Sequence, residues 1–117
     1  MRAGALHRAG SNACLVPEVS KTDSAWERLR GLLGRPALAA GQGLWIAPCP
    51  SVHTIGMRYP LDLVFLDADN SVVRCVENLP AWRLAGSARA HSTVELPAGS
   101  IAQMNIRPGD RLEWRDA

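Results

Sequence analysis

The sequence lacks any long hydrophobic run. No segment approaches the roughly 18 apolar residues that a membrane-spanning helix requires. Near the N-terminus, the small apolar stretch at residues 3–6 is interrupted by His7 and Arg8, so no secretory signal is recognisable. We therefore expect a cytoplasmic protein without membrane association.

Cysteine is also scarce. The three cysteines, Cys14, Cys49 and Cys75, are widely spaced and form no CxxC pair. An odd number at such spacing does not make a disulfide framework. Reduced thiols are typical of a reducing compartment, which agrees with a cytoplasmic location.

A strong charge of one sign is missing as well. The chain has 13 basic and 11 acidic residues, for a net charge of +2, and Lys21 is its only lysine. The arginines are scattered along the sequence, whereas nucleic-acid binding needs basic residues massed on one face. We expect no nucleic-acid partner.

What is present is the composition of an ordinary globular domain. Hydrophobic residues make up 47% and charged residues 21% of the 117 positions, which excludes disordered and fibrous classes. Residues 1–11 are small, polar and aperiodic, so we expect a flexible tail there. Residues 12–117 are expected to form one compact domain.

One helix is predicted at about residues 24–34. Ser24, followed three residues later by Glu27, forms a capping box at its start. Gly34 and Pro36 are typical of a helix end. The apolar face consists of Trp26, Leu29 and Leu33.

The rest of the chain favours β-structure. Leu61–Leu66 is apolar except for Asp62, which predicts a strand covered on both faces, and residues 67–70 predict a hairpin turn after it. Pro17 confines its strand to a sheet edge or a bulge. The fold class expected is α+β and mostly β: a small barrel-like or folded antiparallel or mixed sheet with helix 24–34 packed on it. Strands are predicted at 13–19, 44–47, 61–66, 72–76, 93–96, 101–106 and 111–114.

Residues 49–62 hold the densest cluster of chemically active side chains. Within this segment lie a thiol, an imidazole, a hydroxyl, a thioether, a guanidinium and a carboxylate, and prolines in and beside it favour a shaped loop. Loops held by a rigid sheet often carry binding groups. The candidate ligand-binding residues are Cys49, His53, Thr54, Met57, Arg58 and Asp62.

Three interpretations of this segment remain open. In the structural one, Cys49 and Met57 fill the core, His53 bonds to backbone, and Asp62 caps a turn or binds Arg58. In the second, Cys49, His53 and Met57 form a soft-metal site for copper or zinc, which needs a further imidazole such as His91. In the third, Cys49 is a nucleophile, His53 its base and Asp62 the residue that orients the base.

Glu95 is a further candidate outside this segment. It lies in an otherwise apolar predicted strand, so it is either a buried acid or part of a solvated sheet edge. Because glutamates are seldom buried, the sequence favours the solvated edge.

Several motifs resemble the domain of unknown function 192 family. They are the segments at residues 28–35, 43–46, 51–57, 60–67, 95–99 and 109–112. The resemblance implies a small β-rich domain with one helix, of a bacterial and archaeal family without an established activity. Many members carry an export signal or anchor, and this sequence shows neither.

The resemblance also bears on the candidate site. Met57 and Asp62 belong to the motif shared across the family, whereas Cys49 and His53 resemble a subgroup trait. We therefore expect a non-enzymatic module that binds a small polar or anionic ligand, or a protein partner, without a cofactor or metal. In this hypothesis His53 and Arg58 meet the ligand, Thr54 supplies a hydroxyl, and Asp62 holds Arg58 or the loop backbone.

Overall fold

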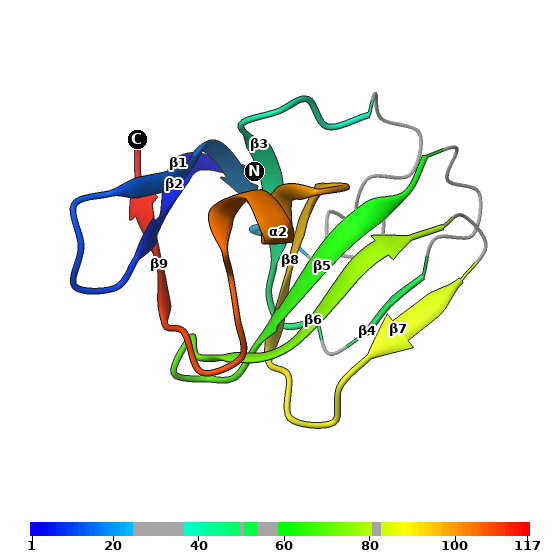
Figure 1. The fold of residues 1–117 in the computed structure, drawn as a ribbon. Coiled ribbons are helices and arrows are strands. Elements are labelled where there is room, and N and C mark those ends of the chain that lie inside the picture. Colours follow the sequence, from blue (N-terminus) through cyan, green and yellow to red (C-terminus); the bar gives the residue numbers. More distant parts are fainter. Residues whose placement is uncertain (25–36, 50, 54–58, 81–82) are drawn as a thin grey trace.

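The computed structural model describes residues 1–24, 37–49, 51–53, 59–80 and 83–117, with residues 51–53 described by their backbone alone. The predicted helix at 24–34 lies, apart from Ser24, outside the described residues. Most of the described chain is arranged in strands that wrap around a shared interior (Figure 1).

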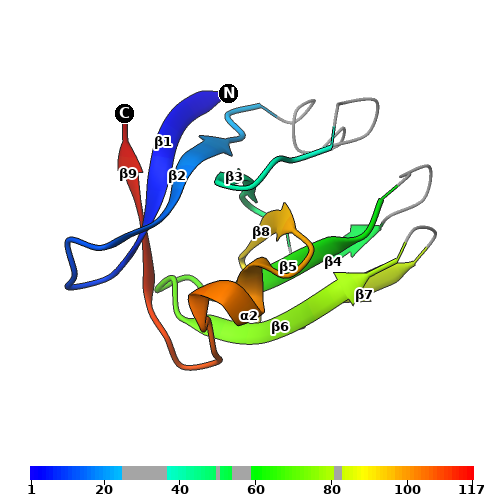
Figure 2. The same cartoon turned by 45° about the horizontal axis from the view of Figure 1, so that its top comes forward.

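Seven strands form one mixed sheet, in the order β6-β5-β8-β3-β2-β1-β9. Neighbouring strands run antiparallel except β2 and β3, which are parallel. The sheet curls strongly (Figure 2), and an isolated bridge between Ser71 and Arg111 joins its two edges at one end without closing it. This confirms the predicted mostly-β fold class. The strands are β1 (Arg2–Arg8), β2 (Cys14–Lys21), β3 (Gln42–Ile46), β5 (Leu61–Leu66), β6 (Val72–Leu79), β8 (Ser92–Pro97) and β9 (Leu112–Asp116).

The concave side of the sheet encloses the larger of two apolar clusters, here called the inner core. Every strand of the sheet contributes to it, and the short helix α2 (Ser100–Met104) adds Ile101 and lies against β5 and β8. Burial of these side chains supplies the main stabilisation of the fold. The inner core consists of Leu6, Val16, Val19, Trp45, Val64, Leu66, Val72, Val94, Leu96, Ile101, Ile106 and Leu112.

The opposite face of β3, β8 and β5 carries the second cluster, here called the outer layer. A two-stranded ribbon of β4 (Ser51–His53) and β7 (Leu84–Gly86) contributes Ala85 to it. Because successive side chains of a strand alternate between faces, one strand serves both clusters. The outer layer consists of Leu44, Ile46, Leu61, Leu63, Phe65 and Ala85.

Strand β5 confirms the prediction that Leu61–Leu66 is covered on both faces. All six of its residues are buried, and β6 follows as its antiparallel hairpin partner. The sequence predicts a sheet edge or a bulge at Pro17, and the structure has the bulge. Two residues of β2, Pro17 and Glu18, lie between the pairs Leu6–Val16 and Gly4–Val19, where β1 has only Ala5.

The expectation of a flexible tail at residues 1–11 is wrong over most of its length. Residues 2–8 form β1, which pairs with β2 on one side and β9 on the other. Leu6 is fully buried in the inner core, and Gly4 lets the Trp114 ring lie against the backbone, where a Cβ atom would come within 2.5 Å of that ring. Only Gly4 and Leu6 of β1 are buried, and two alternating positions are too few for a strand to be recognised from the sequence pattern.

The predicted strand at 101–106 is also wrong. Ser100–Met104 forms α2, which ends at Asn105 in the left-handed conformation with φ of 54°. The backbone N–H of Ile106 then donates to the carbonyl of Ile101 at 3.1 Å, which closes the helix end. Tertiary contacts at both ends of this segment determine its conformation, and a local apolar pattern does not report them.

Candidate functional site

Glu95 is a buried acid at the centre of the sheet. It lies on β8 between Leu44 of β3 and Leu63 of β5, which are its register partners and members of the outer layer. Its residue is only 4% exposed, and its enclosed Oε2 atom has no hydrogen-bond partner in the described part of the chain. The expectation of a solvated edge is therefore wrong, because β8 is an interior strand covered on this face.

Tyr59 brings a second enclosed polar atom to the same layer. Its side chain packs against the outer layer and is partly exposed, but its hydroxyl is enclosed and meets no hydrogen-bond partner from the described residues. Cys49 packs against the same layer. Its backbone is fixed to β8 because its carbonyl accepts a hydrogen bond from the Thr93 hydroxyl at 2.7 Å.

Electrostatics link Glu95 and Tyr59. Burial raises the pKa of the Glu95 carboxyl to about 7. The pKa of the Tyr59 hydroxyl is also raised, first by burial and then by the negative charge of Glu95. No ion pair joins Glu95 to a Lys or Arg within the described part of the chain. A buried carboxyl near neutrality without a counter-ion is characteristic of functional sites.

Asp62 lies on the other face of the sheet from Cys49 and Glu95. Its neighbours Leu61 and Leu63 belong to the outer layer, so Asp62 points to the inner side, where it is fully buried. One carboxylate oxygen accepts the backbone N–H of Asn78 at 2.8 Å, and the other accepts that of Ile101 at 2.9 Å. Asp62 thereby anchors β6 and the start of α2.

The other sequence-predicted site residues cannot be placed by their side chains. The backbone of His53 ends β4 and pairs with Leu84 of β7, while Thr54, Met57 and Arg58 lie outside the described residues. Of the six candidates, Cys49 and Asp62 have described side chains, and the sheet separates them. In the part of the chain that is described, no three His, Cys, Asp or Glu side chains gather as metal ligands.

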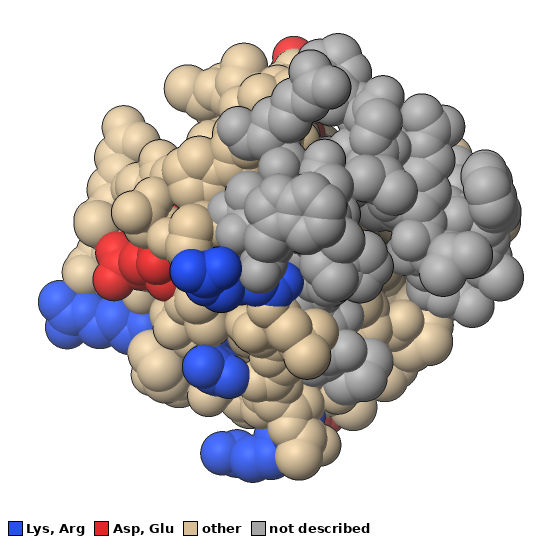
Figure 3. All heavy atoms as spheres, turned by 90° about the vertical axis from the view of Figure 1, so that its right-hand side faces the viewer, with Lys and Arg blue, Asp and Glu red and all other residues tan. Residues whose placement is uncertain are grey.

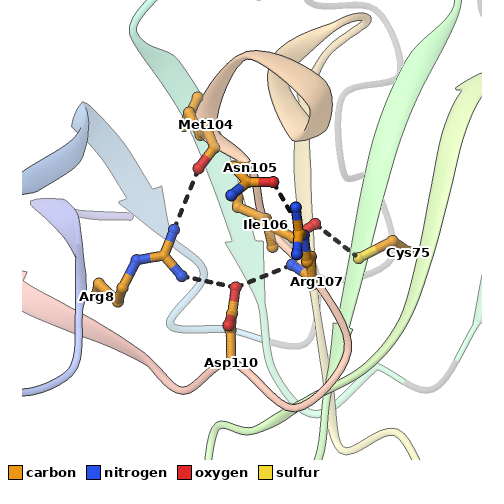
Figure 4. A network of polar contacts seen from close by, with 7 residues as sticks. All are labelled: Arg8, Cys75, Met104, Asn105, Ile106, Arg107 and Asp110. Atoms are coloured by element: carbon orange, nitrogen blue, oxygen red, sulfur yellow. Dashed lines mark hydrogen bonds and ion pairs between the residues drawn. The ribbon is translucent and has the colours of Figure 1, made fainter.

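A separate polar network fixes the turn before β9 (Figure 4). The Arg8 guanidinium donates to Asp110 at 2.6 Å and to the carbonyl of Met104 at 3.2 Å. Asp110 also accepts the backbone N–H of Arg107, which is the first cause of its lowered pKa, with the Arg8 contacts adding to it. Each residue of this network is hydrogen-bonded to another one within it, so its role is to join β1, α2 and β9.

The remaining surface features offer less chemistry. Figure 3 shows basic side chains that stand apart, separated by neutral surface and accompanied by acidic atoms. A hollow of about 380 Å³ beside β1 and β2 is lined mainly by small or apolar residues. Its lining is Ala3, Gly4, Pro17, Glu18, Val19, Ser20 and Ala117.

Comparison with known proteins identifies the family. The model of the DUF192 family, described as uncharacterised ACR proteins, matches residues 6–114. The chain belongs to the DUF192 family. The resemblance predicted from the sequence motifs is thereby confirmed.

Relatives of this DUF192 chain share its fold. It is 40% identical over 65 residues to a UPF0127 protein of Pyrococcus furiosus and 31% identical over 65 residues to one of Pyrococcus abyssi, each match covering 55% of both chains. The chain thus spans about half the length of the curated relatives it matches. Among solved structures, a protein of unknown function from Novosphingobium aromaticivorans superposes with a TM-score of 0.75 at 22% identity, covering 96% of this chain and 84% of the other.

A second solved structure supports the same fold. It is a protein of Sinorhizobium meliloti described as a candidate transcription regulator, with a TM-score of 0.79 at 24% identity, covering 97% of this chain and 92% of the other. At such identities the likeness extends to the fold alone. In the described part of this DUF192 chain, no helix has the length and apolar character needed to cross a membrane.

The three thiols provide a test of the environments that the structure assigns to them. Burial, followed by the charges of Glu77, Asp110 and Asp62, raises the pKa of Cys75 to about 11, whereas Cys14 is exposed. We expect iodoacetamide to modify Cys14 at least about tenfold faster than Cys75 near neutral pH, because the thiolate is the reactive species.

Peptide mass spectrometry over a time course measures these rates, and the two should converge in urea. Equal rates in the folded protein would contradict the assigned environment of Cys75. The same experiment reports on Cys49: an ordinary rate removes the cysteine-nucleophile alternative, and a fast rate persisting at acidic pH favours it.

Proposed function

We propose that this DUF192 domain is a non-enzymatic binding module whose ligand site is the outer layer around Glu95 and Tyr59. The proposal keeps the sequence-based expectation of a binding module and its use of the 49–62 segment, to which Cys49 and Tyr59 belong. It adds Glu95 from the sheet beneath. Localisation in the cytoplasm and the absence of a nucleic-acid partner stay predictions.

The observation that carries the proposal is a pair of orphaned polar atoms in an apolar layer. Glu95 Oε2 and the Tyr59 hydroxyl oxygen are both enclosed, and within residues 1–24, 37–49, 51–53, 59–80 and 83–117 neither has a hydrogen-bond partner. An unmet buried polar group costs about 1–3 kcal/mol, so such groups are rare unless a water, an ion or a ligand meets them. Two such atoms in one layer support a binding site in which a polar group of the ligand forms the missing hydrogen bonds.

The packing around these atoms also suits a ligand site. The partners flanking Glu95 on the neighbouring strands are Leu44 and Leu63, which supply apolar walls. Ligand sites are typically apolar with a few placed polar groups. Tyr59, partly exposed with an enclosed hydroxyl, connects the layer to the surface.

A head-group series tests the proposal. n-Butylamine, n-butanol, butyramide and butyrate share a short alkyl chain and differ in their polar group. We expect at least one of them to cause saturable amide shifts at Tyr59, Thr93 and Glu95 in heteronuclear NMR spectra, with the shifts reduced in Tyr59→Phe. Tyr59→Phe keeps the ring and removes only the hydroxyl.

A matched control is Glu77→Gln, which alters an exposed carboxyl on β6. It should bind as the wild type does. Absence of saturable shifts with all four compounds, or shifts confined to residues outside the outer layer, would contradict the proposed function and leave ordered water as the occupant of the site.

A further inference from the structure

We infer that the ligand of this site presents a primary ammonium group, with Glu95 as its counter-ion and the Tyr59 hydroxyl as a second acceptor. The inference rests on the proposed function and names the chemical class that the site would take. The sequence-based expectation was a small polar or anionic ligand, or a protein partner, and this inference departs from its anionic option.

Hydrogen-bond capacity is the first argument. An ionised carboxylate only accepts hydrogen bonds, and a tyrosine hydroxyl oxygen accepts as well as donates. Neither Glu95 Oε2 nor the Tyr59 hydroxyl has a hydrogen-bond partner among the described residues. A primary ammonium carries three N–H donors on one atom, which is enough for both oxygens, and a carboxylate ligand has no donor for either.

Charge is the second argument. Glu95 is 4% exposed and makes no ion pair with a Lys or Arg in the described ranges. An unpaired buried charge is costly, and the cost falls when an opposite charge binds beside it. An anion would instead be repelled by the carboxylate. The pKa of about 7 means that a cation can draw Glu95 into its ionised form near neutral pH at small expense.

The surroundings favour an organic cation over a metal ion. A metal site needs several ligands, and among the described residues no group of three His, Cys, Asp or Glu side chains is present. Leu44 and Leu63 flank Glu95 and would contact an alkyl chain, while the Tyr59 ring can interact with a cation through its face.

Among the titratable groups of the described residues, the Tyr59 hydroxyl and the Cys49 thiol pack against this layer, and the Met1 amino group lies beside it, where it pairs with Asp23 at 3.4 Å. Arg74 of β6 is the register partner of Phe65, and its guanidinium donates to the carbonyl of Gly86 in β7. An arginine keeps its charge near neutral pH. β3 and β5 present Leu44 and Leu63 beside Glu95. A pH dependence of amine binding near neutrality is therefore expected to follow Glu95.

The experiment compares n-butylamine with n-butanol and butyrate by NMR titration of the intact protein. We expect the amine to bind and the alcohol and acid to bind at least about tenfold more weakly, since a charge-assisted hydrogen bond contributes roughly one to two powers of ten in affinity. Affinity for the amine should rise about tenfold between about pH 6 and about pH 8 as Glu95 ionises.

Two variants identify the acceptor. Glu95→Gln should weaken n-butylamine binding about tenfold or more and abolish its pH dependence, while Glu77→Gln should change neither. Retained thermal unfolding transitions in both variants show that the fold persists. If Glu95→Gln fails to fold, the Glu95 side-chain carboxyl signal of the wild type serves instead: saturating amine should lower its titration midpoint, and butanol should not.

The outcomes separate this inference from the proposed function. Saturable binding of butanol, butyramide or butyrate at the outer layer without amine binding overturns the ammonium assignment and leaves the binding module standing. No binding of any of them overturns both. Nα-acetyl-lysine methylamide, tested beside n-butylamine, distinguishes the source: tighter binding of the lysine derivative indicates a lysyl side chain of a partner, and tighter binding of butylamine a free amine.

Discussion

Replacing Asp62 by alanine is expected to cost about 3–5 kcal/mol of unfolding free energy. Its two carboxylate oxygens accept the backbone N–H groups of Asn78 and Ile101, and the side chain is fully buried. Removing it leaves two enclosed donors without acceptors, each costing about 1–3 kcal/mol, together with a small cavity. Urea unfolding followed by circular dichroism measures the loss.

Two further variants keep this prediction testable if the alanine protein does not fold. Asp62→Asn retains one acceptor oxygen but turns an amide N–H₂ toward a donor, so its loss should be smaller yet above about 1 kcal/mol, with faster amide exchange at Ile101. Asp69→Ala, in the exposed turn after β5, should fall within about 0.5 kcal/mol of wild type. Losses at Asp62 no larger than at Asp69 would disprove the anchoring role.

Glu95 is expected to make the protein about 3 kcal/mol less stable above neutral pH than in mild acid. Its pKa is about 7 when folded, against an ordinary value of 4.5. An acid with a raised folded pKa contributes its full stabilisation below the unfolded pKa and loses it as the pH rises through the folded one. The window is thus about pH 4.5 to 7, at about 1.4 kcal/mol for each pKa unit.

The comparison that isolates this effect is wild type against Glu95→Gln, unfolded in urea at about pH 5 and about pH 8. The neutral glutamine cannot ionise, so the wild type should lose about 3 kcal/mol more than the variant between the two conditions. Glu77→Gln should lose as much as wild type. An equal loss in wild type and Glu95→Gln would show that the carboxyl ionises freely in the folded protein.

The sequence predicted those parts of the fold that depend on local pattern. Leu61–Leu66 carries apolar residues at both alternating positions, which only a doubly covered strand can accommodate, and the polar turn after it determines the hairpin. Pro17 lacks the N–H that a regular ladder requires, so a bulge at β2 follows. Each inference uses residues close together in the chain.

Residues whose surroundings come from distant segments were assigned wrongly. Ile101–Ile106 has a strand-like composition, but the N–H of Ile101 is held by Asp62 from β5, and a left-handed Asn105 ends the helical turn. Residues 2–8 become ordered because β2 and β9 pair with them from both sides. Strand order determines these contacts, and a single sequence does not contain it.

In the candidate site, too, features set by the local sequence were predicted, and features set by distant segments were not. The dense polar segment at 49–62 contains Cys49, which packs against the outer layer, but the sequence grouped this residue with Asp62, which strand alternation sends to the opposite face. The sequence favoured a solvated sheet edge for Glu95 because glutamate is usually exposed. Glu95 is buried because its strand, β8, pairs with β5, which the sequence predicts to be covered on both faces. The sequence does not show that β8 lies beside β5, so it could not predict this burial.

The most direct test of the account is the titration of the Glu95 side chain itself. Carboxyl carbon chemical shifts, assigned by comparison with Glu95→Gln, give its ionisation midpoint in the folded protein without ligand. The account predicts a midpoint at about 7, because the group is enclosed in the outer layer and the described residues supply no counter-ion. A midpoint at the ordinary value of 4.5 would mean that water or a cationic side chain already solvates Glu95. The proposed site would then have no unmet acceptor for a ligand to fill.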